Sequence, residues 1–448
     1  MLKKTVVFIL ICALSFGFSG CDVNSINSFI SEITNSEPVD LTTDSAVNYS
    51  EFDKFSLPND TCYRAVQTDN GYSQLESDGL QKFYDKIEKN IYTVSDKPDK
   101  DGRYLIKQIC LLNIELSERD IRKVIFAYES DNPQIFWLDN TFGYGKSEGS
   151  TVIQLYSYIS AEECNSELRK LEKNVDKILN GLKPGLTEFE RELYIHDSIV
   201  NLSVYSTGVK SLSDGWRHFA SVGLINDGTA VCEGYAKGTQ LLLSYAGIEC
   251  TLINGKSKNE LHMWDLVKID GEWYHLDVTW DDVEDGTTYK YFNLNDKYIN
   301  IDHSISKNYS ELSDDEICGT KTGKKELFNL DIPKCTSEKN NFFVKKAILI
   351  NSLEDSENYF HITGFIVDAV ISGKNSVYIR VGESIDYDSA VNTLFNSYNG
   401  VFFESLTMAD NDIRFDYKNV KRINTKSALI SKDSQFRIIE VVITFVNT

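Results

Sequence analysis

Residues 261–281 read LHMWDLVKIDGEWYHLDVTWD, and this stretch decides the fold at the centre of the chain. Apolar and polar residues alternate on both sides of Asp270-Gly271, a dipeptide that favours a two-residue hairpin turn. With such a turn Ile269 pairs with Glu272, and the register of two antiparallel strands follows from that pair. The sequence therefore predicts a hairpin whose second strand continues to Trp280.

This register brings two polar side chains together. His262 faces Thr279, and Asp277 becomes a diagonal neighbour of His262 on the same face of the sheet. Diagonal neighbours have Cα atoms roughly 7–8 Å apart, which allows a hydrogen bond between an imidazole and a carboxylate. The hairpin is therefore a candidate for the base and the orienting acid of a catalytic site.

A candidate nucleophile precedes the hairpin. Residues 228–236 read GTAVCEGYA, in which a loop leads into a helix expected from about Cys232 to Ala246 and ended by Gly247. The first turn of a helix presents free backbone N–H groups and a partial positive charge. This setting favours a thiolate over a thiol, and the same amides can donate to an oxyanion.

Cys232, His262 and Asp277 together fit the logic of a catalytic triad. Cys232 would attack an acyl carbon as a thiolate, and His262 would pass the proton to the leaving amine. Asp277 would orient His262 and stabilise its charged form. Either water or a second amine would then resolve the thioester.

The same segments resemble the transglutaminase-like superfamily, a branch of the papain-like cysteine-protease fold. The matching motifs are VCEGYA around Cys232, HMWD from His262 and WYHLDVTWD around Asp277. Asp265 replaces a commoner Asn, and Val278 replaces a commoner Pro. The resemblance covers about 120 residues, and it implies an α+β fold in which one long helix packs against an antiparallel sheet, with accessory regions on both sides.

Several other residues are weaker candidates for the site. The second oxyanion donor is expected upstream of the cysteine, and Trp216, Asn226 and Gly228 lie in that stretch. Trp264 could wall a substrate groove, and His275 shares the Asp277 face, although a structural role is the simpler interpretation of both. The other histidines give little signal: His196 is expected at a core edge, whereas His218, His303 and His361 have no partner at an informative spacing.

No metal or cofactor is expected. The acidic residues after the triad could bind calcium through their oxygens, but their spacing matches no known loop, and a solvated acidic turn is the simpler interpretation. These residues are Asp281, Asp282, Glu284 and Asp285. The net charge of −21 and the absence of a basic patch in the sequence argue against nucleic acid as a partner.

The first residues resemble the leader of a bacterial lipoprotein. Lys3 and Lys4 precede an apolar run that ends in Ser19-Gly20-Cys21. This pattern predicts export, lipidation of Cys21 and anchoring at the extracytoplasmic face of the bacterial cell membrane. Protein or peptide substrates outside the cell, including cell-wall peptides, are then expected.

Composition and patterning divide the chain as follows: leader, 1–20; flexible tether, 21–60; N-terminal α+β region, 61–186; transglutaminase-like catalytic domain, 187–306; linker, 307–339; strand-rich C-terminal α+β domain, 340–448. In the last region, Phe360–Ile371, Ser376–Val381 and Phe436–Phe445 are expected to be strands. Two functions remain open at this point. The chain is a cysteine peptidase, amidase or acyltransferase, or it is a surface binding or scaffolding protein with an unused site.

Overall fold

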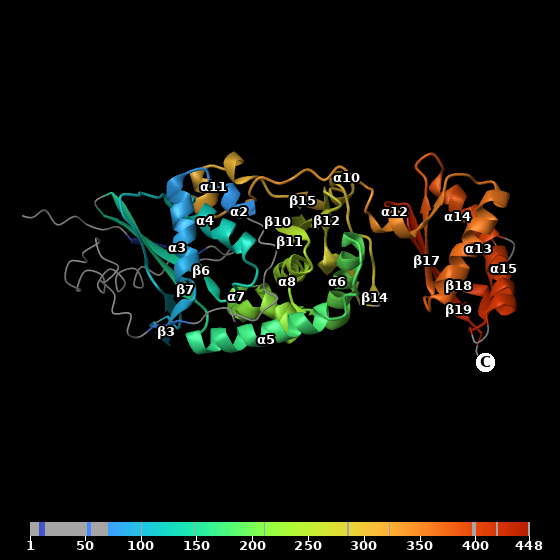
Figure 1. Cartoon of the computed structure of the whole chain (residues 1–448). Coiled ribbons are helices and arrows are strands. Elements are labelled where there is room, and N and C mark those ends of the chain that lie inside the picture. Colours follow the sequence, from blue (N-terminus) through green and yellow to red (C-terminus); the bar gives the residue numbers. More distant parts are fainter. Residues whose placement is uncertain are drawn as a thin grey trace, which may run out of the picture. The chain divides into compact units, whose positions relative to one another are not determined.

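The computed structural model describes residues 9–13, 52–54 and 70–446, except residues 100, 148, 210, 285, 322, 397–399 and 418–419. The chain divides into two compact units (Figure 1). The N-terminal unit comprises Met1–Tyr291 and Asn295–Thr336, and the C-terminal unit comprises Phe292–Leu294 and Ser337–Thr448. Among the described residues, no helix combines the length and apolar character needed to cross a membrane.

The first part of the N-terminal unit is built on a seven-stranded sheet with the order β1-β6-β7-β4-β3-β2, in which β5 also pairs with β7. Its strands are β1 (Ile9–Ala13), β2 (Phe52–Lys54), β3 (Thr93–Pro98), β4 (Tyr104–Ile106), β5 (Ile109–Leu111), β6 (Leu138–Ser147) and β7 (Ser150–Ser157). Its helices are α2 (Asn70–Ser73), α3 (Asp78–Asn90), α4 (Glu118–Asp131) and α5 (Ala161–Leu179). Strand β1 lies inside the predicted leader, so cleavage of the leader would remove it from the sheet. Cys21 and most of the predicted tether lie outside the described residues.

The second part of the N-terminal unit contains the helix and hairpin expected from the sequence. Helix α8 (Cys232–Tyr245) packs against β10 (Glu249–Ser257) and β11 (Glu260–Ile269). The antiparallel sheet has the order β12-β11-β10-β15. The fold is therefore α+β, with a helix on an antiparallel sheet as in a papain-like core.

The remaining elements of this part are α6 (Glu188–Leu202), β8 (Val204–Tyr205), α7 (Leu212–Gly215), the 3₁₀ helix η2 (Trp216–Phe219), the π-helix η3 (Gly223–Asp227), β9 (Thr229–Ala230), β12 (Glu272–Leu276), α9 (Val278–Asp281), β13 (Asp282–Val283), β14 (Gly286–Thr287), α10 (Asp296–Ile299), β15 (His303–Ile305), η4 (Tyr309–Glu311) and α11 (Asp314–Cys318).

The hairpin follows the predicted register over most of its length. Ile269 pairs with Glu272, and pairing continues as far as Asp265 with Leu276. The predicted continuation of the second strand to Trp280 is wrong, because Asp277 ends it by capping the short helix α9 through its side chain. His262 therefore has no Thr279 partner across the strands, although it still reaches Asp277.

The C-terminal unit is a four-stranded sheet with the order β16-β17-β19-β18, covered by helices. The elements are α12 (Phe342–Lys346), β16 (Ile348–Ile350), α13 (Asp355–Ile371), β17 (Ser376–Val381), α14 (Tyr387–Phe395), α15 (Val401–Asp416), β18 (Ile423–Asp433) and β19 (Ile438–Phe445). The strand at Ser376–Val381 is confirmed. The strand expected at Phe360–Ile371 is wrong, because that stretch is helical and buries residues four apart: Ile362, Ile366 and Val370.

Candidate active site

The first turn of α8 and the hairpin bring together the three predicted catalytic side chains. Cys232 is the first residue of α8, and the preceding residue, Val231, makes no side-chain hydrogen bond to the amides of the first turn. His262 Nε2 and Asp277 Oδ2 are 2.6 Å apart, and both side chains are buried. The half-buried Cys232 thiol neighbours the same imidazole closely enough to affect its protonation.

The electrostatics of the pair favour an ionised state. Burial disfavours a charge on His262, but the Asp277 carboxylate and the Cys232 side chain outweigh it and raise the pKa of His262 to about 10. Burial also opposes the charge on Asp277, yet His262 and His303 hold the pKa of that carboxyl well below its usual range. Imidazolium and carboxylate therefore face each other at neutral pH, as the triad mechanism requires.

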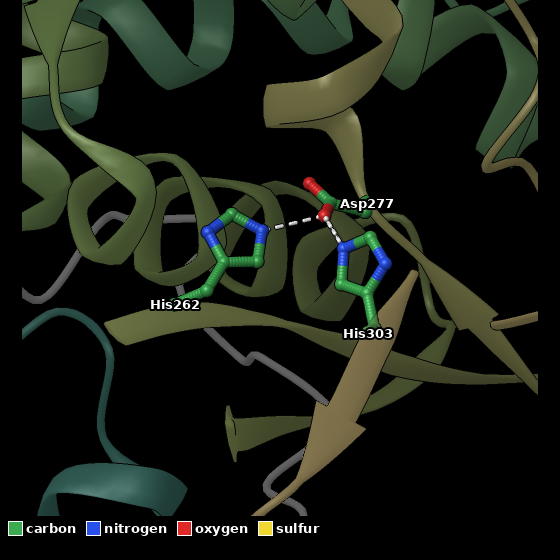
Figure 2. Close-up of side chains that lie close together, drawn as sticks. All are labelled: His262, Asp277 and His303. Carbon is green, nitrogen blue, oxygen red and sulfur yellow. Dashed lines mark hydrogen bonds and ion pairs between the residues drawn. The ribbon is translucent and has the colours of Figure 1, made fainter. Parts of the chain in front are cut away.

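A second histidine shares the acid of the triad (Figure 2). His303 Nε2 lies 3.1 Å from the same Asp277 Oδ2, and its Nδ1 lies 2.7 Å from Asp302 Oδ1. The Asp302 carboxylate also accepts a hydrogen bond of 2.6 Å from the Tyr291 hydroxyl. No partner for His303 was expected from residue spacing, and the structure corrects this: antiparallel pairing of β15 with β10 places His303 beside Asp277.

His262, Asp277 and His303 offer three ligand atoms within 4.8 Å of one another, which is a possible metal-ligand set. In this structure those atoms form hydrogen bonds with one another at 2.6 and 3.1 Å. A zinc ion would need about 2.0–2.2 Å to each of them, and therefore a rearrangement of the cluster. The geometry described here is that of proton sharing.

A second buried His–Asp pair, His196 and Asp281, is connected to Asp277 through the backbone of Tyr291. His196 Nε2 lies 3.2 Å from Asp281 Oδ2, and both side chains are fully buried. Burial opposes the charge on His196, but Asp197 and Asp281 raise its pKa to about 9. The other Asp281 oxygen accepts from the Tyr291 amide at 3.0 Å, and the Tyr291 carbonyl accepts from the Asp277 amide at 3.1 Å.

This network corrects two expectations about the acidic turn. Asp281 is not a solvated residue, because its carboxylate is buried and occupied by His196, Thr288 and the Tyr291 amide. Because these hydrogen bonds already engage both oxygens of the Asp281 carboxylate, the geometry does not support Asp281 as a calcium ligand. The histidine at 196 is buried and contacts the turn that follows the triad acid, rather than lying at a core edge.

The oxyanion side of the site involves a residue that the sequence did not single out. Parallel pairing of β8 with β9 sets Tyr205 opposite Ala230, just before Cys232. Burial and the neighbouring Cys232 side chain raise the pKa of the Tyr205 hydroxyl to about 12, and a hydrogen bond that the Tyr205 oxygen accepts from the Cys232 backbone amide acts in the opposite direction. The hydroxyl and this amide therefore lie together beside the thiol, and both can donate to an oxyanion once the bond between them opens.

The residues suggested earlier for that role are engaged elsewhere. The Trp216 ring stacks on Tyr158 at 5.0 Å between centroids and lines a cavity. Gly228 ends η3 in the left-handed conformation, and its carbonyl accepts from the Val204 amide at 2.9 Å. The Asn226 side-chain amide donates to the Glu167 carbonyl at 3.2 Å.

Trp264 and His275 are structural in this geometry. Trp264 Nε1 donates to His275 Nδ1 at 3.0 Å, and His275 Nε2 lies 3.0 Å from Asp296 Oδ1. Both rings are buried, so a direct contact with substrate is not supported. Trp264 instead packs beneath the His262 ring at 5.8 Å and limits its orientation.

Comparison with known proteins agrees with this site. Residues 176–278, which contain all three triad residues, match the family model of the transglutaminase-like superfamily. The N-terminal unit therefore contains a transglutaminase-like domain. No curated protein matches the chain.

Solved structures show low similarity to parts of the chain. A TGase crystal structure has 12% identity and a TM-score of 0.25, covering 40% of this chain and 53% of that one, so the chain spans about half its length. A candidate cysteine protease from Cytophaga hutchinsonii has 15% identity and a TM-score of 0.21, covering 41% and 68%. A candidate protease from Parabacteroides distasonis has 14% identity and a TM-score of 0.19, covering 29% of each chain.

Proposed function

We propose that the protein is a cysteine enzyme that acts on protein or peptide amides through a thioester at Cys232. The observation that carries this proposal is the buried 2.6 Å contact between His262 and Asp277 beside a cysteine at a helix start. A His–Asp pair of this kind supplies both a proton acceptor and its orientation. A scaffold without chemistry has no need to hold three ionisable groups in this arrangement.

The reaction has two halves. The Cys232 sulfur attacks the amide carbonyl carbon, the C–N bond breaks, and His262 gives its proton to the departing amine. Charge on the carbonyl oxygen is stabilised by the Cys232 amide and the Tyr205 hydroxyl. In the second half His262 takes a proton from water or from a second amine, which attacks the thioester and releases Cys232.

The choice between water and amine decides whether the enzyme is a peptidase or amidase, or a protein-glutamine acyltransferase. We also propose that it acts outside the cell, exported and lipid-anchored at Cys21, because its first residues carry the lipoprotein pattern. Cell-wall peptides are then candidate substrates. Mass spectrometry of the mature N-terminus, with Cys21→Ser as the control, tests the anchor: an unmodified cysteine would refute it.

The test of the chemistry is the pH dependence of iodoacetamide alkylation at Cys232, read by peptide mass spectrometry. Rapid alkylation below about pH 8 that is lost in His262→Ala supports an assembled site. Release of peptide is then compared with incorporation of a labelled amine. If Cys232 is inert, or reacts identically without His262, the enzymatic proposal fails and a binding or scaffolding role replaces it.

A further inference from the structure

Helix α13 in the C-terminal unit is apolar on two sides. Ile362, Ile366 and Val370 point into the core of the unit and are buried. On the other side, Phe360 is 66% exposed and Ile371 is 38% exposed. These two residues are 11 positions apart, about three helical turns, so they lie on one line along the helix. A helix that is apolar on both sides is normally covered on both, and the second side of α13 therefore indicates a binding partner.

A polar line runs beside the apolar one. His361 and Asp368 are both exposed and seven positions apart, about two turns, so they too share one line along α13. Gly364 lies between the two lines, and a Cβ added there would meet no atom within 4 Å. We call these five residues, Phe360, His361, Gly364, Asp368 and Ile371, the outer face of α13.

The order of residues on the outer face of α13 is complementary to its own reverse. When a second copy of the helix lies antiparallel on the first, Phe360 of each copy meets Ile371 of the other. In the same arrangement His361 of each copy meets Asp368 of the other. The midpoints of the two pairs differ by one residue, about 1.5 Å along the helix, so one two-fold axis satisfies both. An interface in which the same surface of both copies meets itself closes at a dimer.

Each of these contacts has a physical reason. Phe360 and Ile371 remove apolar surface from water, and the imidazole of His361 can donate a hydrogen bond to the Asp368 carboxylate. Gly364 lies at the centre, where the absence of a Cβ lets the two backbones approach closely. A parallel arrangement would instead set each residue against itself and oppose two Asp368 carboxylates. The antiparallel order is therefore the one that this face favours.

The charges on α13 do not suit a membrane surface. Helices that lie in the interface of a membrane normally carry Lys and Arg on their polar side, because anionic lipids attract these residues. Residues Asp355–Ile371 contain no Lys or Arg, and the polar line of the outer face includes the carboxylate of Asp368. A second copy of the chain fits this face better than a lipid surface does.

We propose that two copies of the chain associate through the outer face of α13, antiparallel about a two-fold axis, with Phe360 against Ile371 and His361 against Asp368. The inference goes beyond the proposed function and holds whether or not Cys232 reacts. One helix from each copy buries less surface than a tight complex does, so the dissociation constant is expected in the micromolar range. Lipid anchoring of both copies to one membrane would raise the dimer population through effective concentration.

Sedimentation equilibrium of the full chain carrying Cys21→Ser, which cannot be lipidated, tests the dimer between about 5 and 200 µM. We expect the average mass to rise toward that of two chains. Phe360→Ser should raise the dissociation constant at least tenfold, because a two-fold interface loses the contact twice. Leu429→Ser is the matched control, since Leu429 is 64% exposed on β18 in the same unit, and it should stay within about twofold of the native value.

A charge exchange tests the antiparallel register. His361→Glu opposes two carboxylates at two places and should raise the dissociation constant at least tenfold. Adding Asp368→Lys to it should bring the constant back to within about threefold of the native value. Residues seven apart do not face each other within one helix, so this recovery reports a contact between copies.

A native protein that stays monomeric at about 200 µM, or a dimer that Phe360→Ser leaves unchanged, would overturn the inference. Absence of recovery in the charge exchange would overturn the antiparallel register. Binding of a monomeric protein to phosphatidylglycerol vesicles that is lost in Phe360→Ser would assign the face to the membrane instead. If Phe360→Ser lowers the melting temperature by more than a few degrees, Ile371→Ser serves as the second variant, with the same loss of dimer expected.

Discussion

Replacing Asp277 by asparagine should strongly slow the alkylation of Cys232 at acidic pH. In the native site Asp277 outweighs burial and raises the pKa of His262 to about 10. An asparagine removes the two largest causes that raise this pKa and leaves burial opposed by the Cys232 side chain alone, so the pKa of His262 should fall below the 6.5 of a free imidazole. The imidazolium beside Cys232 should then be largely lost at pH 6 and above.

The size of the effect follows from ordinary cysteine chemistry. Without a charged partner, a cysteine of ordinary pKa near 8.5 is about 0.3% thiolate at pH 6. Alkylation of Cys232 by iodoacetamide at pH 6 should therefore drop roughly 100-fold in Asp277→Asn. Near pH 9.5, where a free cysteine ionises unaided, the drop should be less than about threefold.

The assay is the alkylation rate of the Cys232 peptide by mass spectrometry between pH 5 and 10. Asp302→Asn is the matched control, because Asp302 contacts His303 and Tyr291 and should leave the rate within about twofold of the native value. A native rate at pH 6 in a folded Asp277→Asn protein would refute the reasoning, since the charge of His262 would then have another source.

Three further predictions concern stability and the oxyanion. His196, with a folded-state pKa of about 9, contributes stability that is full below about pH 6.5 and is lost as the pH rises through 9. The melting temperature of the native protein should therefore fall over that range more than that of His196→Gln, and parallel curves would contradict this. Gly234→Ala should destabilise by about 1–3 kcal/mol in denaturant unfolding, because a Cβ there would lie 2.4 Å from a backbone oxygen. Gly364→Ala, in open space on α13, should stabilise the protein by roughly 0.5–1 kcal/mol. A lower unfolding free energy for Gly364→Ala than for Gly234→Ala would contradict this prediction. Tyr205→Phe should weaken inhibition by a peptide aldehyde roughly 10–100-fold without changing iodoacetamide alkylation. Tyr235→Phe should change neither the inhibition nor the alkylation. Unchanged inhibition of the Tyr205→Phe protein by the aldehyde would exclude Tyr205 as a donor.

The local part of the site could be predicted from the sequence. Asp270 and Gly271 adopt positive φ values of 52° and 84°, as the expected two-residue turn requires. That turn fixes the register from Ile269 and Glu272 outward, and it places His262 near Asp277 without knowledge of the rest of the chain. The end of the helix that begins at Cys232 could also be predicted from nearby residues, since Gly247 in the left-handed conformation follows it.

The parts that were missed depend on contacts between distant residues. His303 lies 26 positions after Asp277 and 41 after His262, and only the pairing of β15 with β10 brings it to the site. His196 precedes Asp281 by 85 positions. No pattern of residue spacing in the sequence predicts contacts between residues so far apart in the chain. The helix α13 was missed for another reason, because its apolar residues suit both a strand and a buried helix.

The boundary between the two units affects the order in which the site can be completed. Phe292 is fully buried and packs on Phe342 at 6.1 Å between ring centroids, within the C-terminal unit. The carbonyl of the preceding residue, Tyr291, accepts a hydrogen bond from the Asp277 amide. Because a chain is synthesised from its N-terminus, Phe292 can pack only after residues beyond 337 have been made. A nascent chain thus carries its cysteine long before the support of its catalytic acid is in place, so a partly made protein should be inactive.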